Sequence, residues 1–188
     1  MNETIATILK RRSVRAYRPD PVGQPELDLM LEAARHAPSA MNQQPWHFTV
    51  IRNPELLGKL EEHCKSAFLE SKVEALREIA TQEGFSVFYH APMLVIISGD
   101  PSALAAQYDC TLATENMLLA ATSLGIGSCW MNAVMMLHAT EKGKAIFREL
   151  GIAFPEGHQP YAAAAFGYPA EPWPETPPKN ADCVTIME

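Results

Sequence analysis

One stretch of the sequence, from Ala103 to Leu124, constrains the fold more than any other. It reads as a long helix rich in Ala, Leu and Met, whose apolar character is interrupted by Asp109, Glu115 and Asn116. Small residues occur on several sides of this helix, which is typical of a helix packed from most directions. The sequence therefore predicts a central helix, around which the rest of the chain has to be arranged.

Shorter helices and strands are predicted on either side of this helix. Asn2 is a good N-cap for a first helix, Pro25 suits the first position of a second helix, and Pro38 ends that helix. The periodicity predicts helices over 3–10, 25–37, 54–83 (with a break) and 141–150, and strands over 47–51, 94–97, 128–131 and 161–166. Because 188 residues without a low-complexity stretch suit one domain, we expect a single α+β domain over 1–188, with helices around a modest sheet.

The charge and composition of the chain argue against several functions. A formal net charge of −7 disfavours nucleic-acid binding, because neutralising phosphates needs a basic face. The most apolar stretch, Met117 to Leu124, is far too short to span a bilayer, and the first residues lack the apolar run of a signal peptide. The four cysteines and six histidines show no metal-ligand spacing. We therefore expect a soluble, cytoplasmic protein with reduced thiols and no metal.

A basic cluster follows the first predicted helix and comprises Arg11, Arg12, Ser13 and Arg15. Guanidinium groups present planar forks of donors that fit phosphate oxygens, and a serine hydroxyl adds a short donor. In an acidic chain, three arginines within five residues need either protein partners or an anion. The alternative is a solvated helix end, at which basic side chains meet the negative end of the helix dipole.

The segment from Ala37 to Phe48 combines two prolines, uncharged hydrogen-bonding side chains and an aromatic pair. Asn and Gln side chains carry both donors and acceptors, which suits the mixed polar edge of a flavin or a nucleobase. The alternative is an ordinary capped loop whose aromatic residues, Trp46 and Phe48, belong to the core.

Two later segments are further candidates for a binding site. In the run from Gly125 to Met131, glycines allow backbone amides to approach a flat ring, although a helix C-cap explains Gly125 and Gly127 equally well. This run is not a dinucleotide-binding fingerprint, because it follows a helix and lacks the third glycine. Beyond Tyr168, crowded prolines predict an extended tail, in which Lys179 is either an exposed lysine or a cation of the same site.

Together these segments resemble the nitroreductase family of flavoproteins, in its short single-domain form. Family members open with a helix that leads into an R-[RH]-S-x-[RK] element, here Arg11 to Arg15. They continue with a P-S-x-x-N-x-Q-P-W-x-F element, here Pro38 to Phe48, and a G-x-G-x-x-W element after a long helix, here Gly125 to Trp130. A G-Y-P near the C-terminus precedes a basic residue, here Lys179. The order holds over nearly the whole chain, and the second element is the specific one.

The resemblance implies a central, mostly antiparallel sheet flanked by helices, in an intertwined homodimer that holds FMN in a cleft between its subunits. The proline-rich tail, 168–188, is then expected to pack on the partner subunit. Arg11 and Lys179 would hold the FMN phosphate, while Arg12 and Ser13 support phosphate and ribityl oxygens. Arg15 would lie near flavin N1 and O2, where a positive charge favours the anionic reduced flavin.

The resemblance also assigns the residues that line the flavin ring. The opposite subunit would supply Pro38, Ser39, Ala40, Met41 and Asn42, with Gln44 bonding nearby or bracing the loop. The backbone of the same subunit would approach the ring at Ser128, Cys129, Trp130 and Met131. Three features depart from the family pattern: Asn180 follows Lys179 where a second basic residue is common, Ala40 and Met41 make their wall of the cleft more apolar, and residues 54–90 show no match to the flavin contacts of larger relatives.

The reaction implied by the resemblance is ping-pong. NADH or NADPH passes a hydride to flavin N5 and leaves, and a nitroaromatic, a quinone or a similar flat acceptor takes its place. Because the flavin carries the difficult step, no catalytic side chain is expected. The alternatives are a specialised flavin enzyme that dehalogenates an aromatic or fragments the flavin, a flavin-binding module that senses or stores the cofactor, and a structural protein that has lost its flavin.

Overall fold

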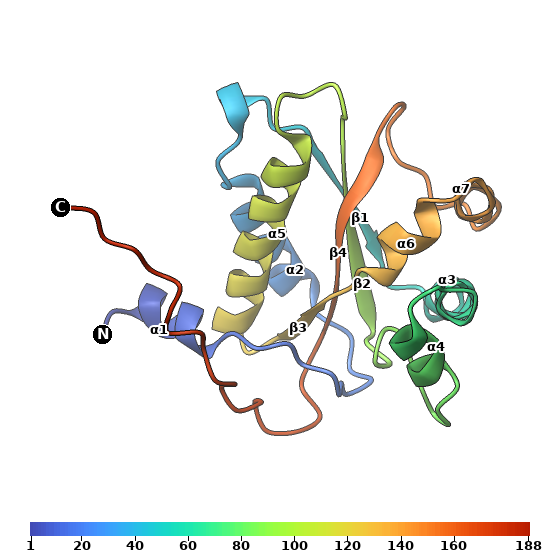
Figure 1. The fold of residues 1–188 in the computed structure, drawn as a ribbon, viewed down its shortest axis with the longest axis horizontal. Helices are drawn as coiled ribbons and strands as arrows, with labels where there is room; N and C mark the ends of the chain where they lie inside the picture. The colour runs from blue at the N-terminus through green and yellow to red at the C-terminus, as the bar shows by residue number, and fades with distance from the viewer.

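In the computed structural model, which describes residues 1–188, an antiparallel four-stranded sheet carries helices on both faces (Figure 1). The strands are β1 (Trp46–Ile51), β2 (Met93–Gly99), β3 (Gly127–Trp130) and β4 (Gln159–Gly167), in the order β1-β2-β4-β3. The helices are α1 (Glu3–Lys10), α2 (Gln24–Arg35), the 3-10 turn η1 (Ala40–Asn42), α3 (Pro54–Leu69), α4 (Glu74–Ala80), α5 (Ala106–Ser123), α6 (Ala133–His138) and α7 (Glu141–Glu149). The predicted α+β class with a mostly antiparallel sheet is confirmed.

Strand β2 lies inside the sheet, and all of its side chains are buried. Since successive side chains of a strand point to opposite faces, Met93, Val95 and Ile97 belong to the core under α2 and α5, whereas Leu94 and Ile96 belong to the core under α3 and α6. The continuous apolar run of this strand is therefore explained by burial on both faces.

The predicted central helix is α5, which packs on α2 and on the sheet. The alanines of β4, from Ala162 to Ala165, are all fully buried and form a small-residue surface between the two helical layers. The other side of α5 is open, because Tyr108 is 74% exposed and Leu112 is 45% exposed. Within one chain, α5 is therefore packed on fewer sides than its composition predicts.

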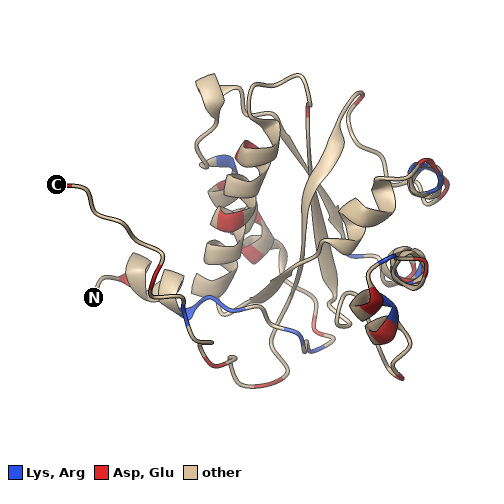
Figure 2. Cartoon of the chain, in the orientation of Figure 1, with Lys and Arg blue, Asp and Glu red and all other residues tan.

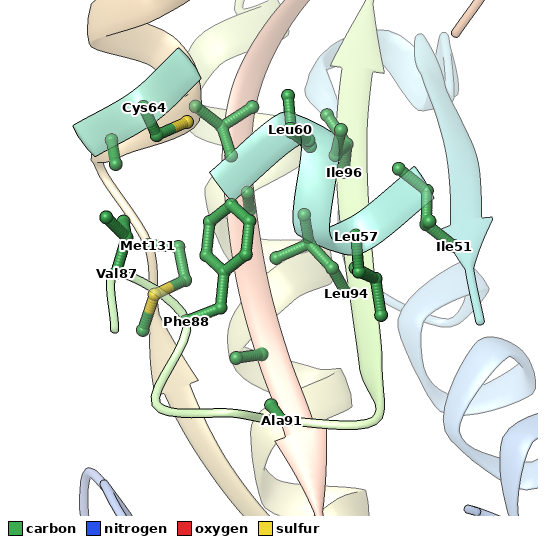
Figure 3. Close-up of a cluster of buried hydrophobic side chains, with 14 of the residues drawn as sticks. Ile51, Leu57, Leu60, Cys64, Val87, Phe88, Ala91, Leu94, Ile96 and Met131 are labelled. Atoms are coloured by element: carbon green, nitrogen blue, oxygen red, sulfur yellow. The ribbon is translucent and has the colours of Figure 1, made fainter. Parts of the chain in front are cut away.

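The second helical layer centres on α3, whose Leu57, Leu60 and Cys64 point at the sheet. Figure 3 shows these side chains meeting Leu94 and Ile96, with Phe88 packed among them. The predicted break in the helical stretch 54–83 falls between α3 and α4. Helix α6 was not predicted, since it has only six residues and follows β3 almost directly. None of the helices combines the length and the apolar character that a membrane span requires.

Candidate functional site

The segment that follows α1 runs alongside the edge strand β3. The Val14 amide donates to the carbonyl of Ser128 over 2.9 Å, and Ser13 and Ser128 form a parallel bridge. A Cβ atom on Gly127 would lie only 2.9 Å from the Val14 side chain, so glycine permits this close approach. Gly125 has a φ of +76° directly after the end of α5. The helix C-cap interpretation is therefore correct for Gly125, whereas Gly127 packs closely against Val14 and the approach of its backbone to a flat ring stays a prediction.

The start of the C-terminal tail closes the other side of the same segment. The Arg18 amide donates to the Tyr168 carbonyl over 2.8 Å, and the Ala170 amide donates to the Ala16 carbonyl over 3.0 Å. Further along, Trp173 Nε1 donates to the carbonyl at Lys10, the last residue of α1, over 2.7 Å. Residues 10–18 are thus held between β3 and the beginning of the tail, and Figure 2 shows Lys and Arg residues following one another along this segment.

Each arginine of the basic cluster has a neighbour within the chain. Arg11 Nε lies 3.2 Å from Glu115 Oε1, and the Arg15 guanidinium carbon lies 5.9 Å from the centre of the Tyr89 ring. Arg12 Nη1 donates to the carbonyls of Leu9 and Arg11 and thereby caps the end of α1. The helix-end interpretation of the cluster is correct for this side chain. It does not account for the other two arginines.

Two buried donors of these segments lack a protein partner. Arg12 Nε and Ser128 Oγ are both buried and make no hydrogen bond. An unpaired buried donor costs about 1–3 kcal/mol, so groups of this kind favour a ligand with acceptor oxygens. The neighbouring Cys129 is a neutral thiol, because burial raises its pKa against the opposing effects of Arg15, Ser13 and Arg11. The side chains present fit a phosphorylated, hydrogen-bond-accepting cofactor such as FMN, and they include no activated nucleophile.

The segment 38–44 lies at the other end of α5 (Figure 1). The Ala40 amide donates to Asp109 Oδ1 over 3.2 Å in the first turn of that helix, whereas β3 begins after its last turn. Along α5, Asp109 precedes Glu115, the partner of Arg11, by about 9 Å at 1.5 Å per residue. Within one chain, no hydrogen bond or ion pair joins residues 38–44 to the basic cluster.

The same segment has an unusual backbone. Met41, Asn42 and Gln44 have φ values of 52°, 55° and 47°, in the left-handed region that non-glycine residues rarely adopt. The Gln44 amide donates to Ser39 Oγ over 3.1 Å, and Gln44 Nε2 donates to Asn42 Oδ1 over 3.0 Å, so Gln44 braces the turn. Met41, at the tip of the turn, is 86% exposed. A strained turn with an exposed apolar tip is typical of a ligand-contacting or subunit-contacting loop.

Three polar residues of α5 each hold another segment against the central helix. Asp109 accepts from the Ala40 amide, Glu115 pairs with Arg11, and Asn116 Nδ2 donates to the Ala33 carbonyl of α2 over 3.0 Å. In the sequence these residues interrupt an apolar stretch, and no role is predicted for them. Charged and amide side chains in a largely apolar helix are the signal that was available.

A pocket of about 460 Å³ opens beside Arg15. Arg15, Ala16 and Tyr17 line one side of it, and residues 79–90, including Tyr89 and His90, line the other. Sequence reasoning found no site residue in this stretch. Lys179, by contrast, is exposed in the tail and makes no ion pair in the structure.

The arrangement defines a class of protein in which a three-layer α+β domain offers a cationic, donor-rich edge to a phosphorylated cofactor. The profile of the nitroreductase family matches residues 8–168, and the chain belongs to this family. The predicted family membership is confirmed. The matched region ends before Lys179, whose role rests on the sequence motif alone.

Individual relatives agree with this assignment. The chain is 34% identical over 176 residues to a protein of Archaeoglobus fulgidus provisionally named NADH dehydrogenase/NAD(P)H nitroreductase, with 91% of this chain and 88% of the relative covered. Its structure is similar to that of a Bacteroides fragilis nitroreductase with bound FMN, with a TM-score of 0.88 and 42% identity over 100% of both chains. A Thermotoga neapolitana iodotyrosine deiodinase is 29% identical over 126 residues, with 63% of this chain and 68% of the relative covered.

Proposed function

We propose that this chain is an FMN-dependent NAD(P)H oxidoreductase that reduces a flat, electron-poor acceptor such as a nitroaromatic or a quinone. When bound, FMN would supply the redox chemistry, a two-electron transfer from NADH or NADPH to the acceptor in a ping-pong cycle. The observation that carries the proposal is the pair of buried, unpaired donors, Arg12 Nε in the basic cluster and Ser128 Oγ on the adjoining strand β3, in a chain that is 42% identical to an FMN-bound relative.

The protein's own residues bind and orient the cofactor. Arg11, Arg12 and Ser13 supply donors for the phosphate and the ribityl chain, and Lys179 adds a cation from the tail. Arg15 presents a positive charge to the pyrimidine edge of the flavin. The backbone from Ser128 to Met131 forms one wall of the site, and the neutral Cys129 thiol leaves this wall without a competing nucleophile.

We further propose that the working unit is a homodimer in which each site takes residues 38–44 from the partner subunit. The lack of any hydrogen bond or ion pair between this segment and the basic cluster within one chain supports the proposal. So do the exposed apolar side chains of α1, because Ile5, Ile8 and Leu9 are each at least 45% exposed although they share one helical face. The tail after Trp173, which is exposed throughout, is proposed to pack on the partner subunit.

Absorption spectra of the purified protein test the activity. A bound-flavin spectrum that NADH or NADPH bleaches without oxygen, and that a nitro compound or a quinone restores, supports it. A bound flavin that neither nucleotide reduces would point to a sensing or storage module. A colourless protein that takes up no added FMN would contradict the proposal altogether.

Subunit complementation tests the shared site. Arg11→Ala removes a phosphate contact of one subunit, and Asn42→Asp places a negative charge on the loop of the other. Each variant alone should be impaired at both sites of its dimer, whereas a mixed dimer should have one intact site. Co-refolding the two variants should therefore restore activity well above that of either variant, and a mixture no more active than its parents would exclude the shared site.

A second candidate function is reductive dehalogenation of an aromatic, which the similarity to an iodotyrosine deiodinase favours. The same reduced flavin would then release halide from a halogenated aromatic. Halide release in the anaerobic assay, measured beside nitro and quinone reduction, distinguishes the two acceptor classes.

A further inference from the structure

Backbone strain in this chain is confined to two segments. The non-glycine residues with positive φ are Met41, Asn42, Gln44, Tyr89 and His90. The first three belong to the proposed flavin-lining loop, and the last two belong to the turn that precedes β2. Left-handed non-glycine residues persist only where their surroundings enforce them, and they cluster at functional sites. The turn at Tyr89 and His90, with φ values of 56° and 57°, therefore needs an explanation.

A half-buried carboxylate on α3 holds this turn. Glu61 Oε1 on α3 accepts hydrogen bonds from Ser86 Oγ over 2.5 Å and from the Phe88 amide over 3.1 Å. Ser86 Oγ in turn accepts from the His90 amide over 2.9 Å. Phe88, which is 2% exposed, packs into the core under α3 (Figure 3). These contacts fix the backbone on both sides of Tyr89 and leave its side chain as the projecting group.

The projecting side chain meets Arg15. The guanidinium carbon lies 5.9 Å from the centre of the Tyr89 ring, and both residues line the pocket beside the basic cluster. Partial burial acts to lower the pKa of Arg15, but Tyr89 and the nearby Cys129 and Tyr17 raise it overall. Arg15 is thus a permanent cation whose direction depends on a partner more than 70 residues away in the sequence.

We propose that Tyr89 is a positioning residue that fixes the Arg15 guanidinium at the pyrimidine edge of FMN, and that Glu61 and Ser86 hold Tyr89 in place. This inference rests on the proposed function, and it adds to it a second group of residues, from the stretch 54–90, that controls the cofactor. A guanidinium that is already oriented loses less conformational freedom when charge develops on the flavin. The arrangement therefore raises the preference of the site for reduced over oxidised FMN.

The midpoint potential of bound FMN, measured by equilibration with redox dyes, tests the proposal. Tyr89→Leu removes the ring that contacts Arg15, and Glu61→Ala removes the acceptor that holds the turn. Each should weaken the preference for reduced FMN about tenfold, which corresponds to a potential about 30 mV lower for a two-electron couple. Glu61→Gln, which keeps one oxygen able to accept, should recover most of the loss.

Two matched controls separate this effect from general damage. Tyr168→Leu removes the ring of a tyrosine that lies 5.2 Å from the Arg18 guanidinium carbon, and Glu62→Ala removes the exposed carboxylate next to Glu61. Neither control should change the potential. Because Tyr89 and Glu61 act through one chain of contacts, the double variant should show no more loss than the larger single loss.

A second readout follows Arg15 itself. In the purified protein, the Nε–H signal of Arg15, assigned by its absence in Arg15→Lys, should exchange with water faster in Tyr89→Leu and Glu61→Ala than in either control. Potentials and exchange rates equal to those of the controls would overturn the inference while the proposed function stands. A wild-type chain that takes up no FMN would overturn both. If Glu61→Ala fails to fold, Tyr89→Leu, which replaces a partly exposed side chain, decides the matter alone.

Discussion

Replacing Arg11 with Ala should weaken FMN binding far more than it weakens the fold. In the structure, Arg11 Nε lies 3.2 Å from Glu115, and the two side chains are 33% and 47% exposed. Ion pairs this accessible contribute about 0–1 kcal/mol to the free energy of unfolding. A lost charged hydrogen bond to a phosphate costs about 1–3 kcal/mol, so the Kd for FMN should rise roughly 5- to 150-fold.

The variant Glu115→Gln tests the same ion pair. If Arg11 turns to a phosphate, the carboxylate of Glu115 is left beside an anion and opposes binding. Glu115→Gln should therefore keep FMN affinity or improve it by up to about 1 kcal/mol, which is the most such an accessible pair contributes. The two variants break the same ion pair and shift the affinity in opposite directions or, at the least, by very different amounts.

Titration calorimetry of FMN into the apoprotein, with urea unfolding beside it, measures both quantities. Arg18→Ala is the matched control, since Arg18 lies in the same segment and pairs with Asp20 over 3.3 Å. The difference in FMN affinity between the wild-type protein and Arg11→Ala should also become smaller as the salt concentration rises, because salt screens accessible charges. An Arg11→Ala protein that binds FMN as tightly as Arg18→Ala would refute the assigned phosphate contact.

Three further outcomes are expected. Gly127→Ala should cost about 1–3 kcal/mol of stability in urea, because the added Cβ would lie 2.9 Å from Val14, and it should lower FMN retention as β3 and residues 13–15 separate. Leu60→Ala, at a fully buried position, should cost about 2–5 kcal/mol in the same assay and leave FMN affinity unchanged per folded molecule. Burial, assisted by Lys144, lowers the pKa of His138, so the folded state favours the neutral ring; this stability is present above the unfolded pKa of about 6.5 and is lost as the pH falls below it. The urea midpoint should accordingly decrease as the pH is lowered from about 7.5 to about 5.5. In a His138→Gln protein the midpoint should depend less on pH over this range.

Local sequence patterns predicted most of the secondary structure. Asn2 and Pro25 placed the starts of α1 and α2, and the continuous apolar run of β2 marked a strand buried on both faces. The alanines of β4 are weak strand formers, yet their strand was predicted and is present between β2 and β3. Helix α6 was not predicted, because a six-residue helix has too few turns to show a helical hydrophobic periodicity.

The candidate site was predictable where residues near in the sequence act together. Residues 11–15 and 38–44 are short runs whose residue types indicate their chemistry, and both are unusual in the structure. The first contains the unpaired buried donor Arg12 Nε, and the second has a left-handed backbone. The contact between Arg15 and Tyr89 was not predictable. It depends on Glu61 reaching a turn 25 residues further along the chain, and no local pattern encodes such a pairing.

The position of the strain suggests how the site is divided between subunits. A left-handed turn at Met41 and Asn42 is fixed to the start of α5 through Asp109, and a second at Tyr89 and His90 is fixed to α3 through Glu61. Both turns present partly or fully exposed side chains on rigid supports, and only the second lies beside the arginines of its own chain. If the first turn meets the arginines of a partner, as we propose, each flavin is oriented by two preformed turns, one from each subunit. Rigid placement of this kind explains why a site without any catalytic side chain would still need strained backbone. The chain contributes orientation and charge to the site, and both contributions depend on groups that are held in place before the cofactor binds.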